Sequence, residues 1–218
     1  MPTPLQIDFV SDIACPWCAV GLASLQQALA RCGDAVRAEL HFHPFELNPD
    51  MGPEGEDPGE HLRRKYGSTP AQQAQIRATI AERGAAVGFA FKPDGRGRIV
   101  NTFKAHRLLH WAGLEGAGKQ LALKRALLEA YHGRGERVDH DDMLLAAVRQ
   151  AGLDGERARH ILAGDEYADA VRAAERRWQM AGIHSVPAVV INQRHLISGG
   201  QPPEVFEQAL RRLAGTAG

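Results

Sequence analysis

Apolar side chains recur at every second position in two segments near the start of the chain. In residues 5–10 they are Leu5, Ile7 and Phe9, and in residues 38–45 they are Ala38, Leu40 and Phe42. A period of two is typical of a strand with one face on the core. We therefore expect two strands here, with His41 and His43 on the second face of the later strand.

The period changes to that of a helix directly after the first strand. Residues 18–29 place one apolar face on a helix, formed by Cys18, Leu22, Leu25 and Leu29. Helical patterning then fills residues 57–181. Thr69 before a proline marks one helix start, Asn101 can cap a helix that runs to residue 109, and a further helix is expected over residues 118–132.

The strand pattern returns after this helical block. Residues 189–191 and 195–197 are short apolar runs joined by a turn at Asn192 and Gln193. A final helix follows, with an expected core face of Val205, Phe206, Ala209, Leu210 and Leu213.

The order of the expected elements is strand, helix, strand, a block of helices, then strand, strand and helix. The simplest account of this order is an α/β fold with a large inserted all-helical domain. Residues 1–56 and 182–218 are then a discontinuous α/β domain, and residues 57–181 are the inserted helical domain.

Charge and composition narrow the function classes. The 218 residues carry 26 basic and 26 acidic side chains, so no net charge favours nucleic acid or an anionic membrane. No apolar stretch reaches the ~18 residues that a membrane span needs. The start, MPTPLQIDFV, lacks the basic and apolar regions of a secretory signal. We therefore expect a cytoplasmic protein.

Cys15 and Cys18 frame the sequence C-P-W-C at the junction of the first strand and its helix. Residues three apart lie on the same side of a helix, so the two thiols can form a disulfide with little movement. Free N–H groups at a helix N-terminus stabilise a thiolate there, and Pro16 suits the first helical position. We expect Cys15 to be the nucleophile and Cys18, one turn deeper, the resolving thiol.

A zinc half-site is the alternative interpretation of the two cysteines. It needs two more ligands, which His41 and His43 could supply from one strand face. Pro-Trp between the cysteines and the helical period after them favour a redox turn. We expect no bound metal or cofactor, and a structural role for Cys32.

Longer segments resemble a known family. SDIACPWC followed by Gly21 looks like the active-site region of the DsbA family of thioredoxin-like oxidoreductases, in its FrnE-type branch. NTFKAHRLLHWA and LLEAYHGRGERVDHDDMLLAAVRQAGL resemble the inserted helices of that branch, and GIHSVPAVVINQRHLISGGQPPEVFEQAL resembles its C-terminal half. The likeness runs from about Ile7 to Leu213 and implies that the α/β part has a thioredoxin-like fold.

The resemblance also implies roles for several residues. Val186-Pro187 is expected to be a cis peptide beside the cysteine pair, with Val186 pairing with extended substrate backbone; an ordinary trans proline is the alternative. The helix that carries Asn101 and His106 is expected near the active-site groove, although Asn101 can be a plain N-cap and His106 a packing residue.

Three further residues belong to the neighbourhood of the cysteine pair. Trp17 is expected to cover the disulfide and to form part of an apolar docking surface. Ser11 and Asp12 are near enough in sequence to tune the thiols, but no pattern assigns either of them a role.

Two enzyme functions remain open. The first is thiol–disulfide exchange with a disulfide-containing protein or a small thiol, with glutathione or a thioredoxin-type reductant as co-substrate. The second is glutathione-dependent isomerisation or transfer on a small, polyketide-like aromatic substrate, as in 2-hydroxychromene-2-carboxylate isomerases and kappa-type transferases. Retention of Cys18 favours the first, because these relatives use one serine or cysteine where Cys15 stands.

A zinc or scaffold protein without enzymatic activity is a third hypothesis. Family resemblance is also compatible with a homodimer. The sequence assigns neither the natural substrate nor the direction of exchange.

Overall fold

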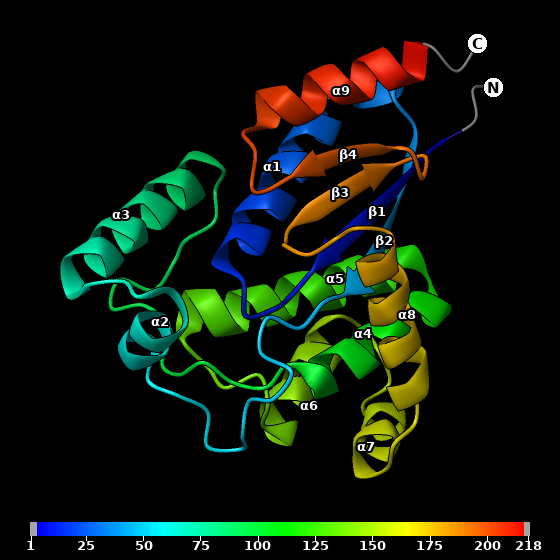
Figure 1. The fold of residues 1–218 in the computed structure, drawn as a ribbon. Helices are drawn as coiled ribbons and strands as arrows, with labels where there is room; N and C mark the ends of the chain where they lie inside the picture. Colours follow the sequence, from blue (N-terminus) through cyan, green and yellow to red (C-terminus); the bar gives the residue numbers. More distant parts are fainter. Residues whose placement is uncertain (1–3, 216–218) are drawn as a thin grey trace.

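A four-stranded sheet lies at the centre of the computed structural model, which describes residues 4–215. Its strands are β1 (Leu5–Ser11), β2 (Ala38–Pro44), β3 (Ala188–Ile191) and β4 (His195–Ser198), in the spatial order β2-β1-β3-β4. β1 is parallel to β2, whereas the β1–β3 and β3–β4 pairs are antiparallel (Figure 1). The two halves of the sheet therefore come from opposite ends of the chain.

All four strands lie where the sequence predicted them, to within one residue at each end. Phe9 of β1 pairs with Phe42 of β2, and their ring centroids are 5.6 Å apart. Residues 192–194 join β3 to β4. Asn192 and Gln193 have positive φ values of 52° and 54°, and the Arg194 N–H donates to the Ile191 carbonyl at 3.2 Å, as in a type I′ turn. The expected strands and turn are thus confirmed.

Helices cover both sides of the sheet. α1 (Pro16–Cys32) and α9 (Pro203–Gly215) pack together on one side, whereas α4 (Phe103–Glu115), α5 (Ala117–Leu128) and α8 (Ala168–Met180) contact β2 on the other (Figure 1). The remaining helical segments are η1 (Gly33–Ala35), α2 (Pro58–Tyr66), α3 (Pro70–Ala86), η2 (Glu129–Arg134), α6 (Asp141–Gln150) and α7 (Gly155–Ala163). Every helix from α2 to α8 therefore lies between β2 and β3 in the sequence.

Two helix boundaries differ from the expectation. α4 begins at Phe103 and continues to Glu115, past the expected end at residue 109. The expected helix over residues 118–132 ends as an α-helix at Leu128 and continues as the π-helical turn η2. This turn lets the His132 carbonyl accept the N–H of Lys92 at 2.9 Å, a tertiary bond that local periodicity does not encode.

One side chain expected in the core is outside it. Val205 of α9 is 40% exposed, whereas Phe206, Leu210 and Leu213 are buried. The buried positions follow the i, i+4, i+7 stripe of a helix, and Val205 lies about 100° away from Phe206 around the helix axis. The expectation for Val205 was therefore wrong.

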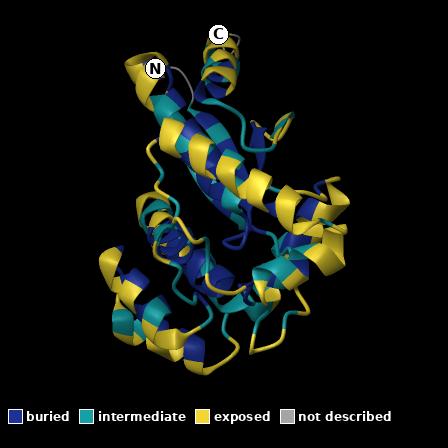
Figure 2. Ribbon diagram, turned by 90° about the vertical axis from the view of Figure 1, so that its left-hand side faces the viewer, coloured by how far each residue is buried: buried dark blue, intermediate teal, exposed yellow. Residues whose placement is uncertain are grey.

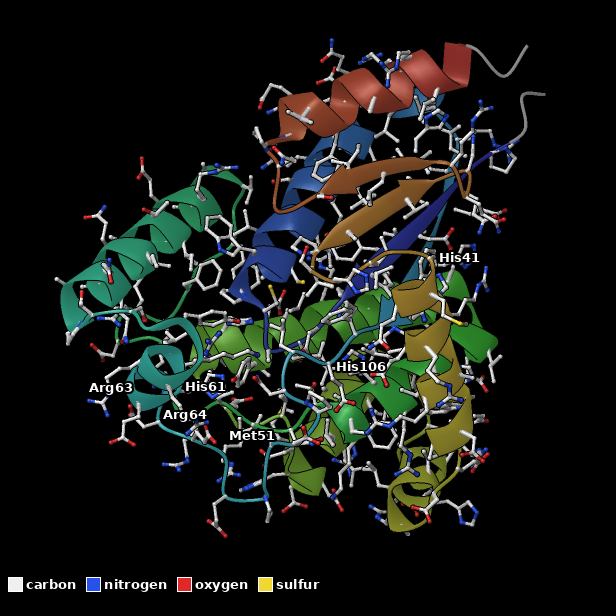
Figure 3. The ribbon with its side chains drawn as sticks, viewed as in Figure 1. His41, Met51, His61, Arg63, Arg64 and His106 are labelled. Atoms are coloured by element: carbon white, nitrogen blue, oxygen red, sulfur yellow. The ribbon has the colours of Figure 1, made fainter. Side chains whose placement is uncertain are left out.

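Helices α2 and α3 form an arm, called here the α2–α3 arm, whose side chains are mostly exposed (Figure 2). Arg83 of α3 fastens it to the sheet domain, since Arg83 Nη2 donates to the Gly200 carbonyl at 3.0 Å. Glu56 precedes α2, pairs with Ile99 in an isolated bridge and binds His61 and Arg64 of α2 (Figure 3). These contacts join the start of the arm to the segment at Ile99. Within residues 4–215, no helix combines the length and apolar character that membrane crossing requires.

Candidate active site

Cys15 lies at the point where the chain enters α1. It is the N-cap residue of this helix, with an extended backbone, and Pro16 occupies the first helical position. The Cys18 N–H donates to the Cys15 carbonyl at 3.1 Å. Because a helix start has N–H groups that lack helical partners, a negative charge on Cys15 is favoured there.

The two thiols differ in acidity. A hydrogen bond from the Cys18 thiol lowers the pKa of Cys15, and the backbone N–H groups of Cys18 and Trp17 lower it further, so that it lies below its ordinary value despite burial. Burial raises the pKa of Cys18 well above its ordinary value, and the neighbouring Cys15 charge raises it further. These opposite shifts favour a thiolate on Cys15 over one on Cys18.

The Val186–Pro187 peptide bond is cis, as the family resemblance implied. It lies against the cysteine pair, because the Cys15 Sγ is 3.5 Å from the Val186 carbonyl oxygen. Gly21 permits this approach: a Cβ atom there would be 3.1 Å from Pro187 Cγ and 3.4 Å from Gly200 Cα. Helix α1 thus packs closely on the loop that carries the cis bond.

A cleft of about 1250 Å³ opens in front of Cys15. It lies between α1, the α2–α3 arm, residues 91–97 and residues 184–186. Of the residues expected to support the site, Cys15, Pro16, Trp17 and Val186 line this cleft. Cys18 is fully buried behind them, in the first turn of α1. The structure therefore brings most of the predicted group together around one space.

Asn101 and His106 do not line the cleft. Asn101 Oδ1 accepts the Phe103 N–H at 2.9 Å, so Asn101 contributes to the start of α4 although the N-cap position itself is Thr102. His106 of α4 is buried, with Nε2 3.4 Å from Asp12 Oδ1 (Figure 3). The contacts of Asn101 thus match the capping alternative, and those of His106 match the packing alternative.

Asp12 is the residue to which the sequence assigned no role and which the structure places under the cysteines. Its buried carboxylate accepts the N–H groups of Ala14 at 3.1 Å and Leu47 at 2.8 Å, and the Thr102 hydroxyl at 2.8 Å. Burial favours a higher pKa for Asp12, but His106 and these donors outweigh it and lower the pKa. Asp12 therefore remains ionised and holds the turn that precedes Cys15.

Lys124 of α5 brings a second charge beneath the cysteine pair. Its side chain is fully buried, and its Nζ is 6.0 Å from the centroid of the Phe42 ring. Burial lowers the pKa of Lys124 to about 8, while the charges of Cys18, Asp12 and Cys15 act in the opposite direction. A lysine in the apolar run LALKRALL was a sequence signal for this buried charge.

Two other residues at the cleft were not expected. His132 Nε2 is 2.8 Å from the Ile13 carbonyl, and burial followed by the charge of Arg96 lowers the His132 pKa to about 3. His132 is thus neutral and donates to that carbonyl. Arg96 Nη1 donates to the Ala14 carbonyl at 2.9 Å. Nothing in the glycine-rich sequence around Arg96 indicated this contact.

The histidines considered as zinc ligands contact carboxylates of the sheet. His43 Nε2 is 2.8 Å from Asp8 Oδ1, and His41 Nε2 is 3.9 Å from Glu39 Oε2. Across residues 4–215, no group of three or more His, Cys, Asp or Glu side chains is arranged to hold a metal ion. Cys32 ends α1 as a buried free thiol, and burial raises its pKa.

Comparison with known proteins gives a consistent result. The model of the DSBA-like thioredoxin domain family matches residues 6–211. A probable DsbA oxidoreductase from Streptomyces coelicolor is similar, with a TM-score of 0.87 and 35% identity over 97% of this chain and 90% of that one. These matches confirm the expected thioredoxin-like α/β fold.

Two more distant structures share the fold alone. A 2-hydroxychromene-2-carboxylate isomerase has a TM-score of 0.74 at 12% identity, covering 97% of each chain. The cytosolic disulfide reductase DsbM from Pseudomonas aeruginosa, solved with GSH, has a TM-score of 0.64 at 17% identity, covering 95% of this chain and 98% of that one.

Proposed function

The chain belongs to the DSBA-like thioredoxin domain family, and from this premise we propose that it is a thiol–disulfide oxidoreductase acting through Cys15 and Cys18. The observation that carries the proposal is the difference between the two thiols. Cys15 has a lowered pKa and lines the cleft, whereas Cys18 has a raised pKa and is enclosed one helical turn behind it. Such a pair suits sequential attack and resolution.

In the proposed cycle the Cys15 thiolate attacks one sulfur of a substrate disulfide. The substrate S–S bond breaks, the departing sulfur takes up a proton, and a mixed disulfide forms on Cys15. Cys18 then loses its proton and attacks Cys15 Sγ, which releases the second substrate thiol and leaves a Cys15–Cys18 disulfide. Two electrons pass from the dithiol to the substrate.

Surroundings of the pair support this cycle. The Val186 backbone lies within reach of the Cys15 sulfur, and an extended substrate could pair with it as an added strand. Two molecules of glutathione, or one thioredoxin-type dithiol, would restore the dithiol by supplying two electrons. The DsbM neighbour, named a cytosolic disulfide reductase and solved with GSH, supports glutathione as the reductant and the cytoplasm as the setting.

A redox titration tests the proposal. The protein is equilibrated in glutathione buffers of stepped ratio, its free thiols are alkylated, and the adducts are counted by mass spectrometry. We expect a two-electron transition in the wild type and in the matched control Cys32→Ser. Cys18→Ser should instead accumulate a glutathione adduct on Cys15. A wild-type protein that forms no reversible Cys15–Cys18 disulfide would overturn the proposal.

A glutathione-dependent isomerase is the second candidate, and the size of the cleft favours it. A space of about 1250 Å³ exceeds what a single disulfide needs and suits a cofactor thiol with an aromatic substrate. Cys18→Ser separates the two functions. Loss of disulfide turnover supports the dithiol cycle, whereas glutathione-dependent isomerisation that survives in Cys18→Ser supports the second candidate.

A further inference from the structure

The cleft in front of Cys15 has an apolar wall and an excess of positive charge. Its apolar wall is formed by Trp17, Tyr66, Ile76, Ile80 and Phe91. Its charged lining residues are Lys65, Arg77, Lys92, Arg96, Asp57 and Asp94. Basic side chains therefore outnumber acidic ones around the space that a substrate would enter.

Contacts within the protein already occupy some of these charges. Lys65 Nζ donates to the Leu47 carbonyl at 2.6 Å and to Asn48 Oδ1 at 2.8 Å. Asp57 caps α2 and accepts the Glu60 N–H at 2.9 Å. Of the four cations, Arg96 is the one whose guanidinium is fixed next to the reactive cysteine.

Arg96 is held in place by its neighbours. One nitrogen donates to the carbonyl of Ala14, the residue directly before Cys15, and the guanidinium carbon is 5.8 Å from the centroid of the Tyr131 ring. Among the described residues, no carboxylate forms an ion pair with Arg96. A guanidinium has five donors in a rigid fork that matches a carboxylate, and most of these donors remain available here.

The Tyr66 phenol lines the same cleft as Arg96 and Cys15 and experiences the charges of both. Burial and the charge of the Cys15 thiolate raise the pKa of Tyr66, while Arg96 lowers it. An apolar surface, a cation and the nucleophilic sulfur therefore converge on the same part of the cleft.

We propose that Arg96 binds a carboxylate of a small disulfide substrate, so that the substrate sulfur meets Cys15 while its apolar body lies on the wall formed by Tyr66 and Ile76. This inference rests on the proposed oxidoreductase function and names its substrate class: small disulfides that carry a carboxylate. Arg96 acts as a binding residue, through a charge-assisted hydrogen bond that a neutral disulfide cannot accept.

Three disulfides of similar size and different charge test the inference: dianionic dithiodipropionate, neutral hydroxyethyl disulfide and dicationic cystamine. We expect the wild type to show the highest kcat/KM with the dianion. Arg96→Gln should lower kcat/KM about tenfold for the dianion and leave the neutral disulfide within about twofold. Arg96→Lys should restore part of the preference.

Arg98→Gln is the matched control, because Arg98 lies on the same loop, binds the Glu54 and Gly55 carbonyls and does not line the cleft. Its variant should keep the wild-type preference. Equal kcat/KM values for the three disulfides in the wild type would overturn the inference without any variant, while leaving the proposed function intact. Failure to reduce any of them, in a protein whose Cys15–Cys18 disulfide forms reversibly, would also overturn the inference, whereas the absence of that disulfide would count against the proposed function.

Alkylation separates substrate binding from an effect on Cys15 itself. Iodoacetate and iodoacetamide react with the same thiolate but differ in charge. Arg96→Gln should lower the rate with iodoacetate and leave the rate with iodoacetamide unchanged. If both rates fall together, Arg96 acts through the Ala14 carbonyl on the thiol, and the inference is wrong.

Discussion

Cys15 and Cys18 are identical residues one helical turn apart, and hydrogen bonding and burial make their acidities different. Cys15 ends the loop that Asp12 holds and receives hydrogen bonds that stabilise its thiolate. Cys18 lies inside the protein, where desolvation disfavours the charged form. In the proposed cycle, the resolving step must therefore generate the Cys18 thiolate in an unfavourable environment.

Lys124 is the cation that counteracts this burial. Its charge lowers the pKa of Cys18, although less than burial raises it. Lys124→Met should raise the pKa of Cys18 further, because the opposing charge is gone. We expect release of the second substrate thiol, followed by stopped-flow, to slow about threefold to tenfold and its pH midpoint to move upward.

Lys119→Met is the control for this change. Lys119 lies on the same helix, but it is exposed and binds the Gly152 carbonyl at the surface. Its variant should keep the wild-type rate and pH midpoint. A Lys124→Met protein with an unaltered resolving step would show that the buried ammonium has no part in the chemistry.

Among the elements, α3 packs closely against residues 89–91 because Gly84 has no side chain. A Cβ atom on Gly84 would lie 2.5 Å from Phe91 Cε2 and 2.7 Å from the Phe89 carbonyl oxygen. Phe91 lines the cleft and contacts His132, with ring centroids 5.7 Å apart. The packing of α3 thus determines where one side of the apolar wall lies.

Gly84→Ala should therefore destabilise the protein, although alanine is the better helix former. We expect a loss of about 1–3 kcal/mol in the free energy of unfolding, because Phe91 must move or α3 must retreat. Gly118→Ala in α5 is the matched control, since no neighbouring atom lies within 4 Å of its added Cβ. The free energy of unfolding of that variant should rise by about 0.5 kcal/mol. Urea denaturation measures both, and equal effects would contradict the packing account.

At the scale of the whole molecule, a charged cluster joins the segment after β2 to α8. Arg172 binds Glu46 and lies 2.9 Å from Glu175, and its guanidinium is 3.9 Å from the Phe103 ring centroid. The Oε1 atoms of Glu46 and Glu175 lack hydrogen-bond partners among the described residues. Burial and the Glu175 charge raise the pKa of Glu46 from 4.5 to about 7.

This shift predicts a pH dependence of stability. In the folded protein Glu46 keeps its proton up to a pH of about 7, whereas in the unfolded chain it releases the proton near pH 4.5. Because the folded state binds more protons between these values, the Glu46 contribution falls as pH rises through them. The lowered pKa of His132, from 6.5 to about 3, works in the opposite direction, because the unfolded chain binds more protons between these two values.

Glu46→Gln isolates the effect, since it imitates the protonated side chain and leaves His132 unchanged. In urea denaturation the variant and the wild type should have similar stability at about pH 5, and the variant should be the more stable at about pH 8. A stability difference that stays constant with pH would contradict the raised pKa of Glu46.

Local patterns were sufficient for the strands and helices and for the position of the cysteine pair at a helix start. Strand alternation, the hairpin turn and the Thr69 cap depend on neighbours a few residues apart, and the structure has each of them where expected. The placement of Cys15 at a helix start follows equally from the sequence around C-P-W-C. The wrong expectation for Val205 shows the limit of local patterns, since an apolar residue at a helix start does not by itself reveal which face of the helix will pack on the core.

The sequence by itself thus determined the α/β arrangement and placed the two cysteines at a helix start, because periodicity and capping act over one or two turns. Only the tertiary structure decided which charges surround those cysteines. Arg96 and Ala14 are 82 residues apart in the chain, and His132 and Ile13 are 119 apart. Such contacts depend on how the helices between β2 and β3 pack back onto the sheet, and that packing is a property of the folded surfaces rather than of any local pattern.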